Sequence, residues 1–288
     1  MNSPADSAVQ ACVAALYVYP VKSCAGVALR EAVLTEAGLD LDRAWMVVDE
    51  AGEFVSQREL PRMALVQVQL RAHEVVLRAP GMLALHLQID AVDSPRRVRV
   101  WDDEVPAWDM GATAAQWFSD FLGQRLRLVR FDPEHRRLSS LKATGGLEAP
   151  NLFSDGFPLL VASEASLAEL NRRLAAGGHA PVGMERFRPN LVLAGVEAHD
   201  EDRLGDLRIE ADQPVTLRMV KPCARCPIPD IDPASAQSHP AVGDALLAYR
   251  SLPAIGGAVA FGMNAIVREG DGAVLQVGQA VRADWRFG

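Results

Sequence analysis

Two cysteines lie three positions apart in a short stretch that is rich in proline and positive charge. The stretch runs from Lys221 to Pro233 and contains Cys223 and Cys226, two of the four cysteines of the chain. A thiol beside fixed positive charge is deprotonated more readily and can bind a soft metal, whereas a cysteine among apolar residues is usually a small buried hydrophobe. The stretch predicts either a thiolate site or a pair of unreactive loop cysteines.

Two common uses of a Cys-x-x-Cys pair do not fit this stretch. A zinc site needs four ligands, and His239 follows at a suitable distance, but the positions of a further histidine hold Gly243, Asp244 and Ala245. A thioredoxin-like pair needs its second cysteine in the first turn of a helix, and Pro229 would clash with the carbonyl four residues earlier. Metal ligation by a thiolate and an inert pair both remain open.

Three further clusters place positive charge at turns and strand starts. Residues 19–26 form a proline turn that displays Lys22 and Ser23 with adjacent backbone N–H groups. Arg188 and Asn190 flank a proline where an apolar strand begins, and Arg43 precedes another strand. Ammonium, guanidinium and N–H groups together are typical of an anion site. Each cluster alone also fits an ordinary solvated turn or a charged strand entrance.

The composition limits the classes of partner. The chain has 288 residues, is 49% hydrophobic and 23% charged, and carries a formal net charge of −8. Nucleic-acid binding is not expected, because affinity for phosphate backbones comes mainly from a surplus of Lys and Arg. Residues 1–10 lack the charged start of a secretory signal, and no apolar run reaches the roughly 20 residues of a membrane span. These features predict a cytoplasmic protein with reduced cysteines and no membrane segment.

Short β-like runs dominate the chain and must position these clusters. Helices are expected at Thr113–Leu122, Ser166–Leu174 and Ala241–Tyr249. The polar segment 133–150 is expected to be either an ordered active-site loop or a mobile one. The pattern predicts a β-rich α+β fold. The expected strands are Ala11–Tyr19, Ala28–Leu34, Ala44–Asp49, Leu65–Leu70, Val75–Leu77, Val98–Trp101, Arg125–Phe131, Phe157–Ala162, Asn190–Leu193, Leu207–Glu210, Val215–Val220, Ala258–Val267 and Gln279–Arg282.

Taken in order, the motifs resemble the MOSC family of molybdenum-cofactor proteins, which includes the mitochondrial amidoxime-reducing component and its bacterial relatives. The stretches 19–26, 41–45 and 56–62 resemble the N-terminal β-barrel domain of that family, and 163–166, 187–190 and 223–233 resemble the MOSC domain itself. The resemblance implies a β-barrel-like domain over residues 8–122. A MOSC-type β-barrel domain with peripheral helices is then expected over residues 123–286.

The resemblance also implies roles for single residues. Cys226 is the expected molybdenum ligand, Cys223 is a neighbour, and Arg225 would favour the thiolate. Asn264 stands where the mitochondrial proteins carry tyrosine. The residues expected to hold the pterin and its phosphate are Lys22, Ser23, Arg43 and Arg188, with Asn190, Ser154, Asp155, Ala224, Arg225 and Asn264 as weaker candidates.

By the same resemblance the chain is expected to be an enzyme that contains the molybdenum cofactor, Mo-molybdopterin, and reduces small N-hydroxylated compounds. Amidoximes, hydroxylamines and N-hydroxylated bases are the implied substrates. Since the four cysteines do not have the spacing of a plant-type iron–sulfur cluster, an external electron donor is needed, such as a ferredoxin, a flavoprotein or a cytochrome b5-like protein. Asp232 or Asp230 is the expected proton relay. The alternative is a carrier of cofactor or of sulfur, with a persulfide on Cys226.

Overall fold

A closed β-barrel forms the larger part of the molecule. The computed structural model describes residues 9–286, so residues 1–8, including the first residue of the expected N-terminal domain, lie outside the described part. Seven strands pair in a ring, because β12 contacts both β13 and β17. In order around the ring they are β12 (Leu159–Ser163), β13 (Leu191–Ala194), β1 (Val9–Val18), β19 (Ala280–Trp285), β14 (Leu204–Glu210), β15 (Pro214–Ala224) and β17 (Ala258–Glu269).

The first strand of the chain belongs to this ring. β1 pairs antiparallel with β13 on one side and with β19 on the other, although these partners are far away in the sequence. Val13, Leu16 and Val18 of β1 are fully buried in the barrel core, where each large apolar side chain contributes about 2 kcal/mol of burial free energy. Two short strands extend the barrel: β2 (Val27–Leu29) beside β1 and β16 (Ser251–Leu252) beside β17. A separate sheet has the order β18 (Val274–Gln276), β3 (Glu31–Thr35) and β4 (Gly38–Leu39).

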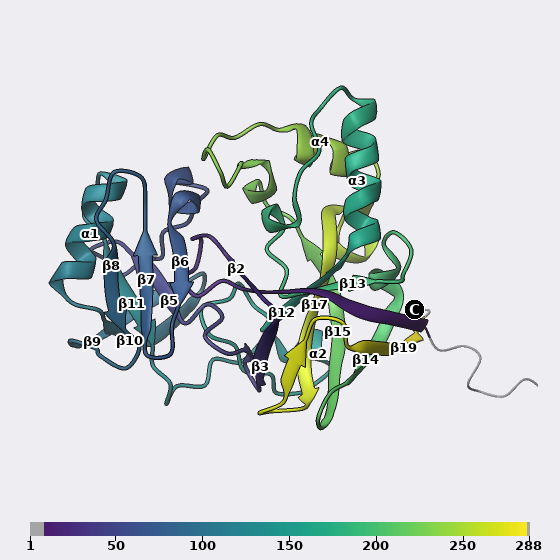
Figure 1. Cartoon of the computed structure of the whole chain (residues 1–288), viewed down its shortest axis with the longest axis horizontal. Coiled ribbons are helices and arrows are strands. Elements are labelled where there is room, and N and C mark those ends of the chain that lie inside the picture. Colours follow the sequence, from purple (N-terminus) through teal and green to yellow (C-terminus); the bar gives the residue numbers. More distant parts are fainter. Residues whose placement is uncertain (1–8, 287–288) are drawn as a thin grey trace, which may run out of the picture.

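A second unit packs beside the barrel and is built from two smaller sheets (Figure 1). One sheet has the order β5 (Trp45–Val48), β11 (Arg127–Phe131), β10 (Asp103–Asp109) and β9 (Pro95–Val100), and the other contains β6 (Gln67–Leu70), β7 (Glu74–Arg78) and β8 (Leu85–Gln88). Helix α1 (Ala112–Leu122) packs on this unit with Trp117, Phe118 and Phe121 toward the core. Gly111 is its N-cap and Gly123 its C-cap, and Gly123 has the left-handed conformation common at that position.

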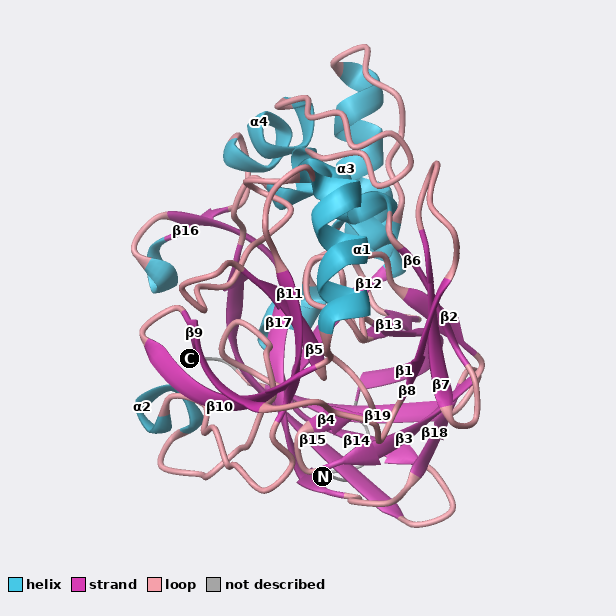
Figure 2. Ribbon diagram, turned by 90° about the vertical axis from the view of Figure 1, so that its left-hand side faces the viewer, coloured by secondary structure: helices cyan, strands magenta, loops and turns pink. Residues whose placement is uncertain are grey.

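The remaining helices lie at the periphery of the barrel. α3 (Glu164–Ala176) and α4 (Ala241–Leu247) contact each other on one side of it, and the single turn α2 (Leu141–Thr144) lies against β15 (Figure 2). Ser163 is the N-cap of α3, since its hydroxyl accepts a hydrogen bond from the Ser166 N–H at 3.1 Å. Short 3₁₀ turns cover Pro61–Leu65, Met184–Arg186, Asp200–Arg203, Ile228–Asp230 and Pro253–Ile255.

The predicted β-rich α+β class is confirmed, but the elements differ in detail. The short strands β4, β8, β16 and β18 were not expected. The expected strand Ala28–Leu34 is two strands, because β2 pairs with β1 while β3 pairs with β18. Strand β10 was not expected, since Pro106 interrupts its apolar pattern, yet it pairs with β9 along its whole length. The division of the chain at residues 122 and 123 stays a prediction. Arg127–Phe131, on the far side of that boundary, pairs with strands of the second unit.

Candidate functional site

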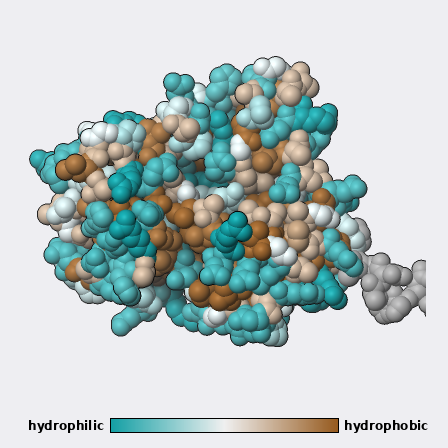
Figure 3. Space-filling view, in the orientation of Figure 1, coloured by the Kyte–Doolittle hydropathy of each residue, from teal (hydrophilic) through white to brown (hydrophobic). Residues whose placement is uncertain are grey.

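A cavity of about 330 Å³ lies between the two units and collects nearly all the residues that the sequence had singled out. On the face drawn in Figure 3, apolar side chains also gather in the middle, between the two units. Of the predicted site residues, the cavity is lined by Lys22, Ser23, Arg43, Ser154, Asp155, Arg188, Asn190, Ala224, Arg225, Cys226 and Asn264. Asp230 and Asp232 are the exceptions.

Strand β15 delivers the two cysteines to the cavity wall. The strand ends at Ala224, so Cys226 lies just past it, ahead of the 3₁₀ turn Ile228–Asp230 rather than in an α-helix. The hydrogen bonds of Arg225 go to Cys223 and Phe187. Its Nη1 donates to the sulfur of Cys223 at 3.3 Å and its Nη2 to the carbonyl of Phe187 at 3.0 Å. Within residues 9–286, the sulfur of Cys226 has no hydrogen-bond partner and is free to act as a ligand.

The two aspartates of the cysteine loop order the loop itself. Asp232 accepts hydrogen bonds from the Ala234 N–H at 2.9 Å and the Ser235 hydroxyl at 3.0 Å, and it does not line the cavity. Asp230 accepts one from the Gly243 N–H of α4 at 2.8 Å. Both carboxylates are occupied by local bonds, so their placement gives no support to the expected proton relay.

Two arginines that are far apart in the sequence lie against the ring of Tyr19. The guanidinium carbons of Arg43 and Arg188 lie 4.4 Å and 4.2 Å from the ring centroid. Arg43 pairs with buried Asp42 and also donates to the Asn190 side chain at 3.2 Å, so Asn190 fixes this arginine. A side chain at Gly26 would lie within 2.4 Å of the Tyr19 ring, and this packing requires glycine there.

The backbone at these positions is strained. Ser23, Arg43 and Arg188 have φ angles of 68°, 52° and 58°, in the left-handed region that non-glycine residues seldom adopt. Each such residue costs about 1–2 kcal/mol, and strain of this kind persists where the surrounding structure enforces it, often at functional sites. Three strained residues in one cavity mark it as a specialised site.

Several buried hydrogen-bond donors at the cavity have no acceptor within residues 9–286. They are Nη2 of Arg188, Nε of Arg225 and the side-chain nitrogen of Gln57, all on residues that line the cavity. Burial, and then the neighbouring charge of Arg43, lowers the pKa of Arg188 to about 10, which leaves the guanidinium charged at neutral pH. Buried donors are normally paired, and a charged one is costly to leave unpaired. An anion such as a phosphate would satisfy them.

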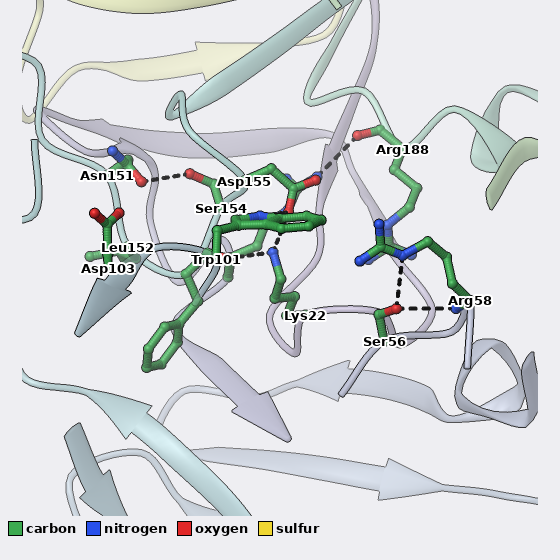
Figure 4. A network of polar contacts seen from close by, with 12 residues as sticks. Lys22, Ser56, Arg58, Trp101, Asp103, Asn151, Leu152, Ser154, Asp155 and Arg188 are labelled. Atoms are coloured by element: carbon green, nitrogen blue, oxygen red, sulfur yellow. Dashed lines mark hydrogen bonds and ion pairs between the residues drawn. The ribbon is translucent and has the colours of Figure 1, made fainter. Parts of the chain in front are cut away.

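A short chain of polar contacts closes another wall of the cavity (Figure 4). The buried Lys22 ammonium donates to the Phe153 carbonyl at 2.9 Å and pairs with Asp155, whose other contact is the Trp101 indole N–H at 3.1 Å. Burial lowers the pKa of Lys22. Desolvation opposes ionisation of Asp155, but the Lys22 charge prevails and holds the pKa of Asp155 below its usual value.

Arg137 supports this wall from behind. The arginine is buried, and its Nη1 donates to the Asn151 side chain and to the carbonyls of Leu152 and Ser154, at 2.6–2.8 Å. Its Nε donates to Asp103 at 2.7 Å. One side chain thus fixes the segment that carries Ser154 and Asp155. Arg137 lies in no recognisable sequence pattern, because its partners are brought together only by the fold.

The cavity is also lined by residues that were not among the predicted site residues. Arg58 and Trp101 line it, together with Phe54, Ser56 and Gln57. The stretch Ser56–Arg62 contributed to the family resemblance, which was a usable signal for Arg58. Trp101 had no signal of its own, since a tryptophan at a strand end is usually a core residue.

The chain matches two domain families and is similar to several known proteins. Residues 10–125 match the MOSC N-terminal beta barrel domain and residues 148–282 match the MOSC domain. The mitochondrial amidoxime reducing component 2 of Rattus norvegicus is 34% identical over 232 residues, which cover 77% of this chain and 67% of that protein. The mitochondrial amidoxime-reducing component 1 of Homo sapiens is 36% identical over 231 residues, covering 77% and 66%. The molybdenum cofactor sulfurase of Homo sapiens is 28% identical over 244 residues, covering 78% of this chain but 27% of that protein.

Proposed function

Because the chain belongs to the MOSC family and carries both its N-terminal barrel and its MOSC domain, we propose that it binds the molybdenum cofactor and reduces N-hydroxylated compounds. Amidoximes, hydroxylamines and N-hydroxylated bases are the proposed substrates. The observation that carries the proposal is the cavity. Its lining includes the thiol of Cys226 and buried N–H groups of Arg188 and Arg225 that lack an acceptor.

The side chains of the cavity match the chemical parts of this cofactor. Cys226 would supply the thiolate that a soft metal prefers, and Arg188, Arg225, Ser23 and Gln57 would donate to the phosphate and the pterin. When bound, the cofactor would provide the chemistry that removes the oxygen atom from the N–O bond of the substrate. The protein orients it, neutralises its phosphate and leaves an open side for the substrate.

The proposal includes a separate electron donor and a cytoplasmic location. A ferredoxin, a flavoprotein or a cytochrome b5-like protein would deliver the two electrons consumed in each reduction, and a reducing compartment keeps the free thiol of Cys226 available. None of the helices within residues 9–286 is long and apolar enough to cross a membrane.

Replacement of the proposed ligand tests the function. In Cys226→Ser we expect reduction of benzamidoxime by a chemically reduced dye to fall by more than about a hundredfold, together with the molybdenum content, because an alcohol is a poor ligand for a soft metal. The matched variant Cys223→Ser keeps the metal, since that thiol contacts Arg225 instead. Full activity and a normal metal content in Cys226→Ser would disprove the assignment.

A second function is favoured by the similarity to a molybdenum cofactor sulfurase. In that case the cavity would carry cofactor, or Cys226 would carry a persulfide, without reduction of a substrate. Molybdenum and pterin with turnover support the reductase, whereas bound cofactor without turnover supports the carrier. A persulfide detected by mass spectrometry on a protein without molybdenum supports the sulfur relay.

A further inference from the structure

Trp101 occupies an unusual place for a tryptophan, in the two-residue turn between β9 and β10. Its φ angle is 55°, a conformation that turns normally assign to Gly, Asn or Asp and that costs a bulky residue about 1–2 kcal/mol. The residue is 42% exposed and lines the cavity. An exposed aromatic side chain that is held in a strained turn and lines a cavity indicates a role in binding.

Arg58 is held against this tryptophan. Its guanidinium carbon lies 4.7 Å from the centre of the indole, and its Nε donates to the Ser56 hydroxyl at 3.1 Å. Glu59 is the next residue and interacts electrostatically with Arg58, but its carboxylate accepts hydrogen bonds from the N–H and hydroxyl of Ser56. Within residues 9–286, no carboxylate lies within ion-pair distance of Arg58. Its charge is oriented but not paired.

The charges of the cavity are otherwise accounted for. Lys22 pairs with Asp155 and Arg43 pairs with Asp42. Arg188 and Arg225 donate to backbone carbonyls and keep unpaired N–H groups, which suit the two negative charges of a phosphate. Arg58 is left without an anion, in the cavity lining and next to an aromatic ring.

From this arrangement we infer that Arg58 and Trp101 form an outer subsite that selects planar N-hydroxylated substrates bearing a negatively charged group, such as a carboxylate. The inference rests on the proposed function. The indole gives a planar substrate a surface to lie against, and the guanidinium of Arg58 donates to the anionic group in the manner of a charge-assisted pair. Both residues determine specificity, and neither takes part in removal of the oxygen.

The test compares benzamidoxime with 4-carboxybenzamidoxime in two measurements. Binding to the cofactor-loaded protein is measured calorimetrically without an electron donor, so that no reduction occurs, and kcat/KM is measured with a reduced dye. We expect the wild type to favour the carboxylated compound and Arg58→Met to reduce that preference about tenfold in both measurements, the size of one partly solvated charge-assisted hydrogen bond. Higher salt should narrow the preference in the wild type.

Arg62→Met is the matched control, because Arg62 also lies over an aromatic ring, that of Phe121, but does not line the cavity. It should leave the preference intact. Trp101→Leu should weaken binding of both aryl compounds, and Trp101→Phe should weaken it less, since a planar ring remains.

Three results would overturn the inference: no preference in the wild type, an equal loss in Arg62→Met, or loss of molybdenum and pterin from Arg58→Met, which would assign Arg58 to the cofactor. Failure of the proposed function gives a different result. In that case no compound is reduced, while the calorimetric preference and its dependence on Arg58 persist.

Discussion

Arg188 makes several contacts at once, and few other side chains could replace it in this geometry. One nitrogen donates to the Cys24 carbonyl at 2.6 Å, the guanidinium stacks on Tyr19, and the other terminal nitrogen is buried without a partner. Its backbone is left-handed, and its carbonyl accepts from Arg43 at 3.2 Å. A single residue therefore links the turn after β1, the strand β13 and the proposed phosphate position.

We expect Arg188→Lys to fold but to lose cofactor. Lysine keeps the charge, but it has one nitrogen and cannot bond to the Cys24 carbonyl and to an anion in the geometry of a guanidinium. The affinity for the cofactor should fall about 10- to 100-fold, the equivalent of one charge-assisted hydrogen bond. Molybdenum and oxidised-pterin content per protein measure the loss, and thermal unfolding verifies the fold. A variant with full cofactor content would contradict the role given to Arg188.

Single site residues could be predicted from the sequence where they belong to a local sequence pattern. Lys22, Arg43, Arg188 and Cys226 each lie in a turn or strand entrance with a recognisable pattern, and the cavity brings them together. The roles of other residues depend on contacts across the fold. Trp101 reaches Asp155, which lies in another segment of the chain, and no local pattern encodes that contact.

Among the elements, the segment 151–155 receives three hydrogen bonds from one buried arginine, in addition to those from Lys22. Arg137→Met removes the bonds to Asn151 and to the carbonyls of Leu152 and Ser154, leaving buried acceptors unpaired. We expect the free energy of unfolding to fall by about 2–4 kcal/mol and cofactor content to fall with it. Urea denaturation monitored by tryptophan fluorescence measures the first effect.

The neighbouring Arg136 supplies the control for this variant. Its side chain is 53% exposed and its pairs with Glu36 and Glu148 lie at the surface, where such pairs contribute about 0–1 kcal/mol. Arg136→Met should therefore unfold like the wild type. Equal losses in the two variants would show that Arg137 acts through net charge and not through the segment that it fixes.

The sequence predicted elements best where one periodic pattern has one structural use. Helices were predicted at Thr113–Leu122 and Ser166–Leu174, and α1 and α3 contain these ranges. The pattern was misleading where the partners of a strand change along its length, as between β2 and β3, or where a proline lies inside a paired strand, as in β10. Pairing partners are a property of the fold, and hydrophobic periodicity does not specify them.

For the whole molecule, each of the two units contains a strand from the other side of the predicted domain boundary. A fragment of residues 1–122 contains β1 without β13 and β19, and a fragment of residues 123–286 contains β11 without β5 and β10. We expect neither fragment alone to unfold cooperatively, because each lacks paired strands and buried apolar surface. Co-expression of both should restore a cooperative thermal transition by circular dichroism. A cooperative transition in the isolated fragment 123–286 would show that the barrel tolerates the loss of β1.

The ring position of β1 also bears on how the protein is made. On a ribosome, residues 9–18 emerge long before β13, and the other neighbour, β19, emerges more than two hundred and fifty residues later. Pairing between such distant segments is slow, and it leaves an apolar strand unpaired while the rest of the chain is synthesised. The barrel closes only after translation of β19, so the cavity between the two units is also completed late. Loading of the proposed cofactor into that cavity would then follow synthesis. The unpaired β1 is the segment that a chaperone would protect while the rest of the chain is made.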